Sequence, residues 1–377
     1  MLNTQPLMFA IPFAVVSATA SAGGMEKTAM PTAFIYESGN YAELSFQNSD
    51  YDVSSSAGGN VSVVGDLQMT SFAFKVALTD SFSFGVARYL QSSIDINYPS
   101  NWVTSQASLL GGSSLATDLP SANLKIDATA ALMNYHVNEN FSVTGGVKIS
   151  TVQDASLKIP FAATNIAVTG DTETSYVYGL AYERPDIALR AELVREESVE
   201  FSLAANGTFG AIPGTPPTVL QATGAQASLP NYTTLNLQSG IAPDTLAFFS
   251  ARRADWEAHQ VILSNALGSS AISSFTDTTT YSVGIGRKIT ESLSGSISYN
   301  WEEGSSPTST SSLSITDGYR GISAGLKYNT GNITISGGIN YTELGDTIVS
   351  QAGTNLSNAP FEDNSVTTVG LRIGYHF

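Results

Sequence analysis

The stretch that decides the fold is the last one, Val366-Thr-Thr-Val-Gly-Leu-Arg-Ile-Gly-Tyr-His-Phe377. Its large apolar side chains occupy every second position, which gives a stripe of Val369, Leu371, Ile373, Tyr375 and Phe377. The positions between them are small or charged: Gly370, Arg372, Gly374 and His376. A period of two predicts a β-strand whose faces meet different surroundings. One apolar face and a terminal aromatic residue are typical of the last strand of a bacterial outer-membrane barrel.

The composition agrees with this interpretation. Only 13% of the 377 residues are charged, and the mean hydropathy is +0.05, whereas soluble domains carry about 25% charged residues. No run of about 18 apolar residues follows the amino-terminal region, so helical membrane spans are excluded. A net charge of −16 argues against nucleic-acid binding, because no excess of cations is present to displace counterions. The sequence has no Cys, which excludes disulfides and metal-thiolate sites.

The amino-terminal residues resemble an export signal. An apolar core at 7–16 is followed by the small residues of 17–22, which end in Ala20-Ser21-Ala22. We predict a signal peptide over residues 1–22, with cleavage before Gly23. No Lys or Arg precedes the apolar core, which departs from the usual pattern. The alternative is a short buried helix.

The mature chain repeats one rhythm of extended segments. Alternation predicts about fourteen strands, an even number as bacterial single-chain barrels require, at 41–52, 66–78, 81–97, 124–137, 141–159, 168–184, 187–203, 231–242, 245–262, 276–289, 291–303, 318–330, 332–345 and 365–377. Tight turns such as Thr79-Asp80 and Pro243-Asp244 alternate with long polar links such as 98–123 and 204–230. Short turns at one end and long loops at the other predict a transmembrane antiparallel β-barrel over residues 41–377. The alternative all-β folds are a soluble sandwich and a solenoid.

Individual strands also predict which face meets the lipid. Leu44 and Phe46 alternate with Ser45 and Gln47, and Ile297 and Tyr299 with Ser296 and Ser298. A charge at the membrane midplane costs roughly 2–4 kcal/mol, so we expect the polar stripes to face the lumen.

Two arginines break this alternation. Arg88 shares the parity of Phe82, Phe84 and Val86, and Arg252 shares the parity of Leu246, Phe248 and Trp256. A β-bulge would reverse the facing, and an arginine near an interface can extend its head group to water. We expect the second explanation at Arg252, beside an interfacial Trp256. At Arg88 both explanations stay open.

No enzyme motif fits the sequence. Gly321-Ile-Ser-Ala-Gly325 matches G-x-S-x-G, but that motif requires a strand-to-helix turn, and here it lies inside an alternating strand. His136, His259 and His376 are scattered without metal-ligand spacing. We therefore predict no catalytic residues, no metal site and no cofactor.

Several segments resemble a known family of transporters. Gly23–Thr28, Phe34–Phe46 and the terminal strand resemble the FadL/TodX-type outer-membrane transporters of hydrophobic compounds, in the short form found in alphaproteobacteria. Ser81–Gly85 and Leu229–Thr233 also look like that family. The resemblance spans essentially the whole mature chain.

The resemblance implies a monomeric barrel with an amino-terminal hatch, here the short segment 23–40. Met30-Pro31-Thr32 stands roughly where longer members carry an Asn-Pro-Ala element. Long-chain fatty acids or other hydrophobic molecules would be captured by outer loops and leave sideways into the membrane. We place the opening where strand three would bend inward, from Gly85 to Arg88. The implied partners are outer-membrane lipid, lipopolysaccharide and, through Phe377, the barrel assembly machinery.

The predicted ligand contacts are of two kinds. Apolar loop residues would capture the chain, although they could instead only pack the loops together: Trp102, Leu109, Leu110, Phe209 and Ile212. A cation would bind the carboxylate. Lys148 has no acid at neighbouring inward positions and is our first candidate, whereas Arg190 shares its face with Glu192 and could simply be paired. Lys75, Lys288, Lys327 and Arg372 are further candidates.

Two other functions stay open. A porin for small hydrophilic solutes would need opposed charged rings at a constriction, but the inward positions are mostly Ser, Thr, Gly and Ala. A structural or adhesive barrel would need an added domain or enlarged loops. The sequence does not distinguish among alkane, fatty acid and aromatic ligands.

Overall fold

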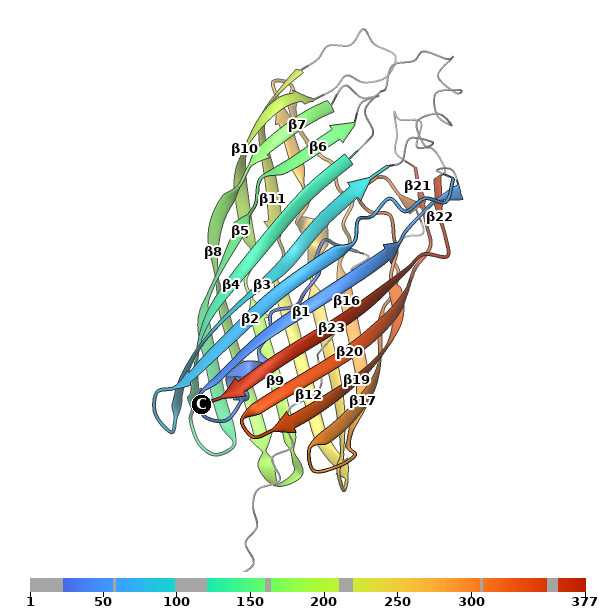
Figure 1. Cartoon of the computed structure of the whole chain (residues 1–377). Coiled ribbons are helices and arrows are strands. Elements are labelled where there is room, and N and C mark those ends of the chain that lie inside the picture. Colours follow the sequence, from blue (N-terminus) through green and yellow to red (C-terminus); the bar gives the residue numbers. More distant parts are fainter. Residues whose placement is uncertain are drawn as a thin grey trace, which may run out of the picture.

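The computed structural model describes residues 23–56, 59–98, 121–159, 164–209, 220–305, 308–350 and 359–377, with the backbone alone at residues 159 and 209. Fourteen antiparallel strands of these residues close into a barrel, because the last strand pairs with the first (Figure 1). They are β1 (Tyr41–Asp52), β2 (Leu67–Ala77), β3 (Phe82–Asn97), β4 (Ser121–His136), β5 (Phe141–Val152), β8 (Asp171–Arg184), β9 (Leu189–Glu196), β12 (Tyr232–Ala242), β13 (Thr245–Ala254), β16 (Thr278–Lys288), β17 (Leu293–Glu302), β19 (Tyr319–Thr330), β20 (Ile333–Leu344) and β23 (Ser365–His376). The predicted fold and strand number are confirmed. The predicted signal peptide, residues 1–22, lies outside the described part.

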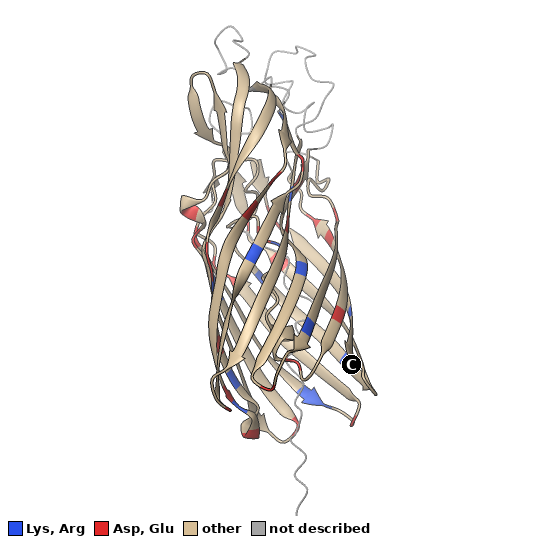
Figure 2. Ribbon diagram, turned by 90° about the vertical axis from the view of Figure 1, so that its left-hand side faces the viewer, with Lys and Arg blue, Asp and Glu red and all other residues tan. Residues whose placement is uncertain are grey.

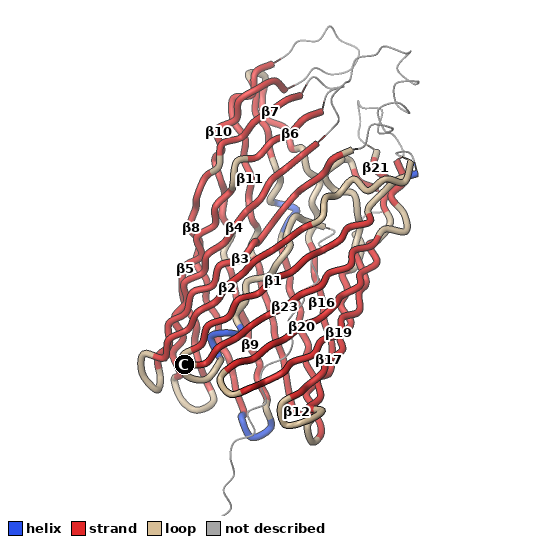
Figure 3. The backbone as a smooth tube through the Cα atoms, in the orientation of Figure 1, coloured by secondary structure: helices blue, strands red, loops and turns tan. Residues whose placement is uncertain are grey.

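Further strands extend the wall at the end that carries the long connections. This end is called the loop end here, and the opposite end is the turn end. These further strands are β6 (Ala155–Ile159), β7 (Thr164–Thr169), β10 (Val199–Phe209), β11 (Leu220–Leu229), β14 (Ile262–Asn265) and β15 (Gly268–Ala271). A small separate sheet joins β18 (Thr308–Ser309), β21 (Thr347–Val349) and β22 (Ala359–Phe361). Strands dominate the structure in Figure 3.

The helical turns are short: η1 (Ala33–Tyr36), η4 (Pro185–Ile187) and η5 (Trp256–Ala258). Within the described ranges, no helix is both long and apolar enough to cross a membrane.

The outer surface is apolar where the alternation predicts it. Leu44, Phe46, Ile297 and Tyr299 are exposed, while Ser45 on the opposite face is buried in the lumen. Charged residues are thinly spread along the strands in Figure 2.

Aromatic pairs gather at two heights along the barrel. Phe82–Tyr135 and Phe141–Tyr182 lie at the turn end, and Tyr281–Trp301 lies toward the loop end. Two aromatic belts bordering an apolar band are the pattern of a transmembrane barrel.

Arg252 does not reach an interface on the outside, so that expectation was wrong. It lies on the inner face of β13, 7% exposed, and β13 pairs with β16 without a register shift. Phe248 shares this inner face and lines the lumen. Trp256 is fully buried and packs on Phe275 at 5.4 Å between ring centroids. The inward arginine is tolerated because two carboxylates neutralise it, and one of them comes from the hatch.

Gly85 to Arg88 is not an opening either. These residues pair with β2 on one side and with β4 on the other. Gly85 instead makes room for η1, because an added Cβ there would overlap the buried side chains of Phe34 and Ile35. Arg88 faces outward and lies 3.4 Å from Asp127. The bulge in β3 lies three residues further on, at Gln91 between Leu90 and Ser92.

Candidate functional site

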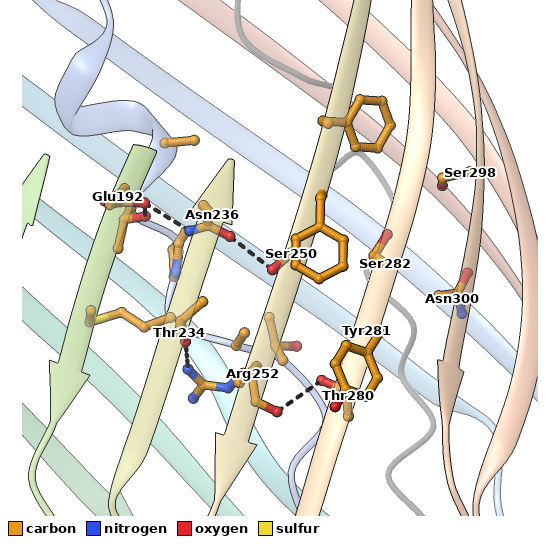
Figure 4. Close-up of a pocket in the computed structure, with 18 of the residues that line it drawn as sticks. Glu192, Thr234, Asn236, Ser250, Arg252, Thr280, Tyr281, Ser282, Ser298 and Asn300 are labelled. Carbon is orange, nitrogen blue, oxygen red and sulfur yellow. Dashed lines mark hydrogen bonds between the residues drawn. The ribbon is translucent and has the colours of Figure 1, made fainter. Parts of the chain in front are cut away.

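The lumen contains a polar cavity around the hatch. Its volume is about 340 Å³, and most of its wall residues carry hydroxyl, amide or charged groups. Figure 4 shows a chain of polar contacts across it: the Asn236 amide donates to Glu192 at 2.8 Å, and the Ser250 hydroxyl donates to Asn236 at 2.8 Å. On the next strands of the same wall, β16 and β17, Ser282, Ser298 and Asn300 continue this polar surface. We call this region the polar cavity.

Toward the loop end the interior becomes apolar. Along β13 and into η5, the inward positions change from Ser250 and Arg252 to Ala254 and the buried Trp256. The larger of the hydrophobic clusters among the described residues fills this part of the lumen, and it includes Tyr51, Val53, Leu67, Ile94, Ile96, Ile126, Phe201, Phe275, Ile315 and Leu344. A small pocket of about 70 Å³ opens within it. We call this region the upper chamber.

A cluster of four charged groups separates the two regions. Arg252 donates two hydrogen bonds to Glu26 of the hatch, at 2.7 and 3.0 Å, and one to Glu196 at 2.8 Å. Lys148 donates to Glu196 at 2.7 Å. The ring of Tyr232 stacks on the Arg252 guanidinium at 4.1 Å. Two cations and two carboxylates balance, which keeps this buried group neutral overall, as burial of charge requires.

The same hatch segment bonds to a part of β3 that β2 leaves unpaired. Pairing of β2 with β3 ends at Phe72–Arg88, although β2 begins at Leu67 and β3 continues to Asn97. Contact between the two resumes only at the Val64–Ile96 bridge. We call the interval from Tyr89 to Ile94 the pairing gap.

Residues 25–28 of the hatch lie against the pairing gap. The Lys27 amide donates to the Gln91 carbonyl at 2.8 Å, the Ser93 amide donates to the Met25 carbonyl at 3.1 Å, and Glu26 pairs directly with Ser92. The hatch therefore satisfies backbone groups of β3 that β2 leaves unpaired, and Glu26 fastens it to Arg252 on the opposite side of the lumen.

The hatch residues predicted from the sequence all line the polar cavity. Met30 is buried, Pro31 is partly exposed, and the Thr32 hydroxyl donates to Glu192 at 2.9 Å. η1 follows directly and packs its buried Phe34 and Ile35 beside β3. The hatch thus contacts the wall at both ends of the polar cavity.

Lys148 is not the free cation that we predicted. Its ammonium is fully buried and bonded to Glu196, which lies on β9 rather than on a neighbouring position of β5. Arg190 does line the polar cavity, but its partner is Glu183, at 2.9 Å, rather than Glu192, and its guanidinium stacks on Tyr36 at 4.1 Å. Among the remaining candidates, Arg372 lies 3.6 Å from Glu43, Lys75 donates to the Glu37 carbonyl, and Lys288 pairs with Glu291.

The predicted capture residues lie outside the described structure. Trp102, Leu109, Leu110 and Ile212 fall in the segments 99–120 and 210–219, and the side chain of Phe209 at the end of β10 is also outside it.

The sequence analysis missed Glu26, Glu196 and Lys27. One signal was available: Arg252 broke the outward parity of its strand, and an inward Arg needs a carboxylate partner.

Solved structures of similar fold were found, although no protein-family model matches the sequence and no curated protein is similar to it by sequence. A Pseudomonas aeruginosa FadL homologue has a TM-score of 0.70 and 14% identity, over 92% of each chain. The Pseudomonas putida toluene transporter TodX gives 0.64 and 14%, also over 92% of each chain. The Ralstonia pickettii toluene transporter TbuX gives 0.63 and 11%, over 94% of this chain and 96% of that one.

These comparisons establish the fold. The chain folds as a FadL- and TodX-type barrel, which confirms at the level of architecture the resemblance found in the sequence. The fold is that of bacterial outer-membrane barrels, in agreement with the location predicted from the terminal strand. TodX and TbuX are named as toluene transporters, and the Pseudomonas aeruginosa protein is named as a FadL homologue.

Proposed function

We propose that this barrel takes up hydrophobic molecules across the outer membrane, long-chain fatty acids among them, and releases them sideways through the pairing gap. The observation that carries the proposal is the coincidence of three features at one height. The upper chamber ends there, the charged cluster forms its floor, and β2 and β3 stop pairing. Movement of residues 25–28 would then connect the chamber with the membrane.

Transfer free energy favours this route. An apolar chain gains roughly 0.8 kcal/mol for each methylene that leaves water. A molecule that continued along the axis would first have to pass the buried charged cluster and separate its ion pairs, which is costly. A molecule that leaves between β2 and β3 enters hydrocarbon, where the gain is kept. The charged cluster on the axial route therefore supports lateral release over axial passage.

The remaining expectations complete the proposal. The barrel would act as a monomer in contact with outer-membrane lipid and lipopolysaccharide, and Phe377 would serve as the signal for the assembly machinery. Phe377 is exposed, and its ring stacks on Tyr375 at 6.0 Å. It stands at the end of β23 beside β1, where the barrel closes.

A disulfide that locks the hatch to β3 tests lateral release. Glu26 and Ser92 are directly opposite each other and their neighbours make the backbone hydrogen bonds. Such pairs have Cα atoms roughly 4.5 Å apart, within disulfide range. The sequence has no Cys, so Glu26→Cys with Ser92→Cys gives one defined pair. We expect the oxidised protein to lose most uptake of labelled fatty acid and the reduced protein to regain it.

The comparison of oxidised with reduced protein removes the effect of the substitutions themselves. Glu26→Cys alone, exposed to the same oxidant, is the matched control and should transport equally before and after treatment. Equal uptake by the locked and unlocked double variant would refute release at the pairing gap.

The polar cavity supports a second candidate, a porin for small hydrophilic solutes. Its Ser, Thr and Asn side chains could hydrate a sugar. The hatch occupies this region, with Met30, Pro31 and Thr32 lining the cavity. Swelling of proteoliposomes in sugar solutions distinguishes the two functions: we expect none for the intact hatch, and swelling at porin rates would favour the porin.

A further inference from the structure

Lys27 is a cation on the hatch that borders both regions of the lumen. It lines the small pocket of the upper chamber and also the polar cavity. Its backbone amide is bonded to Gln91 across the pairing gap, which fixes the position of the residue. Its ammonium lies 5.5 Å from the centroid of the Tyr51 ring, within the range of a cation–π contact.

Lys27 differs from the other cations near the charged cluster in having no anionic partner. Lys148, Arg190 and Arg252 each make an ion pair of 2.9 Å or less. Within the described residues, no carboxylate forms an ion pair with Lys27. An aromatic face partly compensates an ammonium but leaves its hydrogen-bond donors available.

The surroundings of Lys27 are amphipathic. On the chamber side the pocket is lined by Val53, Ile94, Ile96, Phe275 and Ile315, together with polar residues that include Ser93 and Asp95. On the other side lie the hydroxyl and amide groups of the polar cavity. A molecule with an apolar chain and an anionic head group would place each part against matching surface at this position.

We propose that Lys27 binds the anionic head group of an amphiphilic ligand whose apolar chain enters the upper chamber at the small pocket, where the packed side chains move apart to admit it. This inference rests on the proposed function and deepens it, because it assigns head-group recognition to the hatch rather than to the barrel wall. The residue that binds the head group then belongs to the segment that covers the pairing gap. Ligand recognition and closure of the wall share residues 25–28.

Binding of a matched pair of ligands tests the assignment. Dodecanoate and its methyl ester carry the same chain, and only the first is an anion. Their affinities are measured with the purified full barrel in a non-ionic detergent, for the unaltered chain, Lys27→Met, Lys27→Arg and Lys125→Met. Lys125 lies on the outer face of β4 and serves as the control for loss of one positive charge.

A charge-assisted contact in a poorly hydrated pocket corresponds to about a ten-fold change in affinity or more. We therefore expect Lys27→Met to weaken dodecanoate binding by that factor and to leave the ester unchanged. Lys27→Arg and Lys125→Met should retain dodecanoate binding. Unchanged ester binding also shows that the Lys27→Met barrel is folded.

Three results would overturn the assignment: equal losses for both ligands, no loss for either, or the same selective loss in Lys125→Met. Failure of the unaltered barrel to bind either ligand is a different result, because it refutes the proposed uptake function itself. The two failures are therefore distinguishable in one experiment.

Discussion

The two regions of the lumen, the upper chamber and the polar cavity, are built on the same strands but are lined by different kinds of side chain. β9 carries Glu192 and Glu196 inward, and its continuation β10 carries the buried Val199 and Phe201. The outer surface shows the reverse order, with its apolar band beside the polar cavity and between the two aromatic belts. The polar cavity lies inside the part of the wall that faces lipid. The upper chamber lies inside the part that extends beyond the aromatic belt nearer the loop end.

The positions of the two regions relative to the lipid-facing band explain the importance of the pairing gap. The floor of the upper chamber lies at the pairing gap, and residues 25–28 of the hatch cover this interval, where the wall is incompletely paired. The charged cluster blocks the axial route at the same height. Each prediction below alters one side of this arrangement.

The largest effect is expected from Arg252→Met, which removes a cation of the charged cluster between the upper chamber and the polar cavity. Glu26 would lose its cation while buried, and Glu196 would keep only Lys148. Breaking a buried ion pair by removing one member costs about 3–5 kcal/mol. We expect a lower temperature for loss of the heat-modifiable form and a loosened hatch that admits sugars in the swelling assay. Arg253→Met is the matched control, because Arg253 faces outward with 56% of its side chain exposed. Equal effects of the two variants would contradict a boundary set by Arg252.

A medium effect is expected from polar substitution in the upper chamber. Ile94→Asn would remove apolar contact worth about two methylene groups, which corresponds to roughly a ten-fold loss of affinity for a neutral ligand such as methyl dodecanoate. Ile94 is 8% exposed and lines the small pocket. Ser298→Val, which makes the polar cavity more apolar, should leave that affinity unchanged. Comparable shifts at both positions would mean that the ligand occupies both regions.

The smallest effect is expected at the turn end of the hatch. Thr32→Val removes the hydrogen bond to Glu192, and that carboxylate keeps its bond from Asn236, so the cost should be about 1 kcal/mol. We expect the backbone amides of residues 30–37 to exchange hydrogen faster, because this bond is lost, while ligand affinity stays unchanged. Thr28→Val is the control, since among the described residues the hydroxyl of Thr28 has one hydrogen-bond partner, the Met69 sulfur at 3.5 Å. A change in ligand affinity would show that the turn end also takes part in binding.

Most of the barrel could be predicted because its signals are local. Side chains of a strand alternate with a period of two, and the cost of a charge in lipid fixes which stripe faces outward. The facing of Leu44, Phe46, Ile297 and Tyr299 followed from this rule alone. The rule failed at Arg252, because Leu246 and Phe248 are apolar residues that face a lumen.

The candidate site was predicted less well, because its contacts join residues far apart in sequence. Arg252 meets Glu26 across 226 positions, and Lys148 meets Glu196 across 48. Lys148 seemed free because only acids on its own strand were considered. The hatch was predicted as a segment, and its residues Met30, Pro31 and Thr32 do line the lumen, but its place against β3 was not.

The sequence by itself determined the all-β class, the fourteen strands and the apolar outer face, since alternation and turn chemistry are properties of neighbouring residues. Tertiary structure alone decided where β2 and β3 stop pairing, which segment covers the interval, and which cations are neutralised. Barrel closure sets these features, because it superposes residues of separate strands at one height, and the free energy of a buried charge depends on the partner found there rather than on its neighbours in the chain.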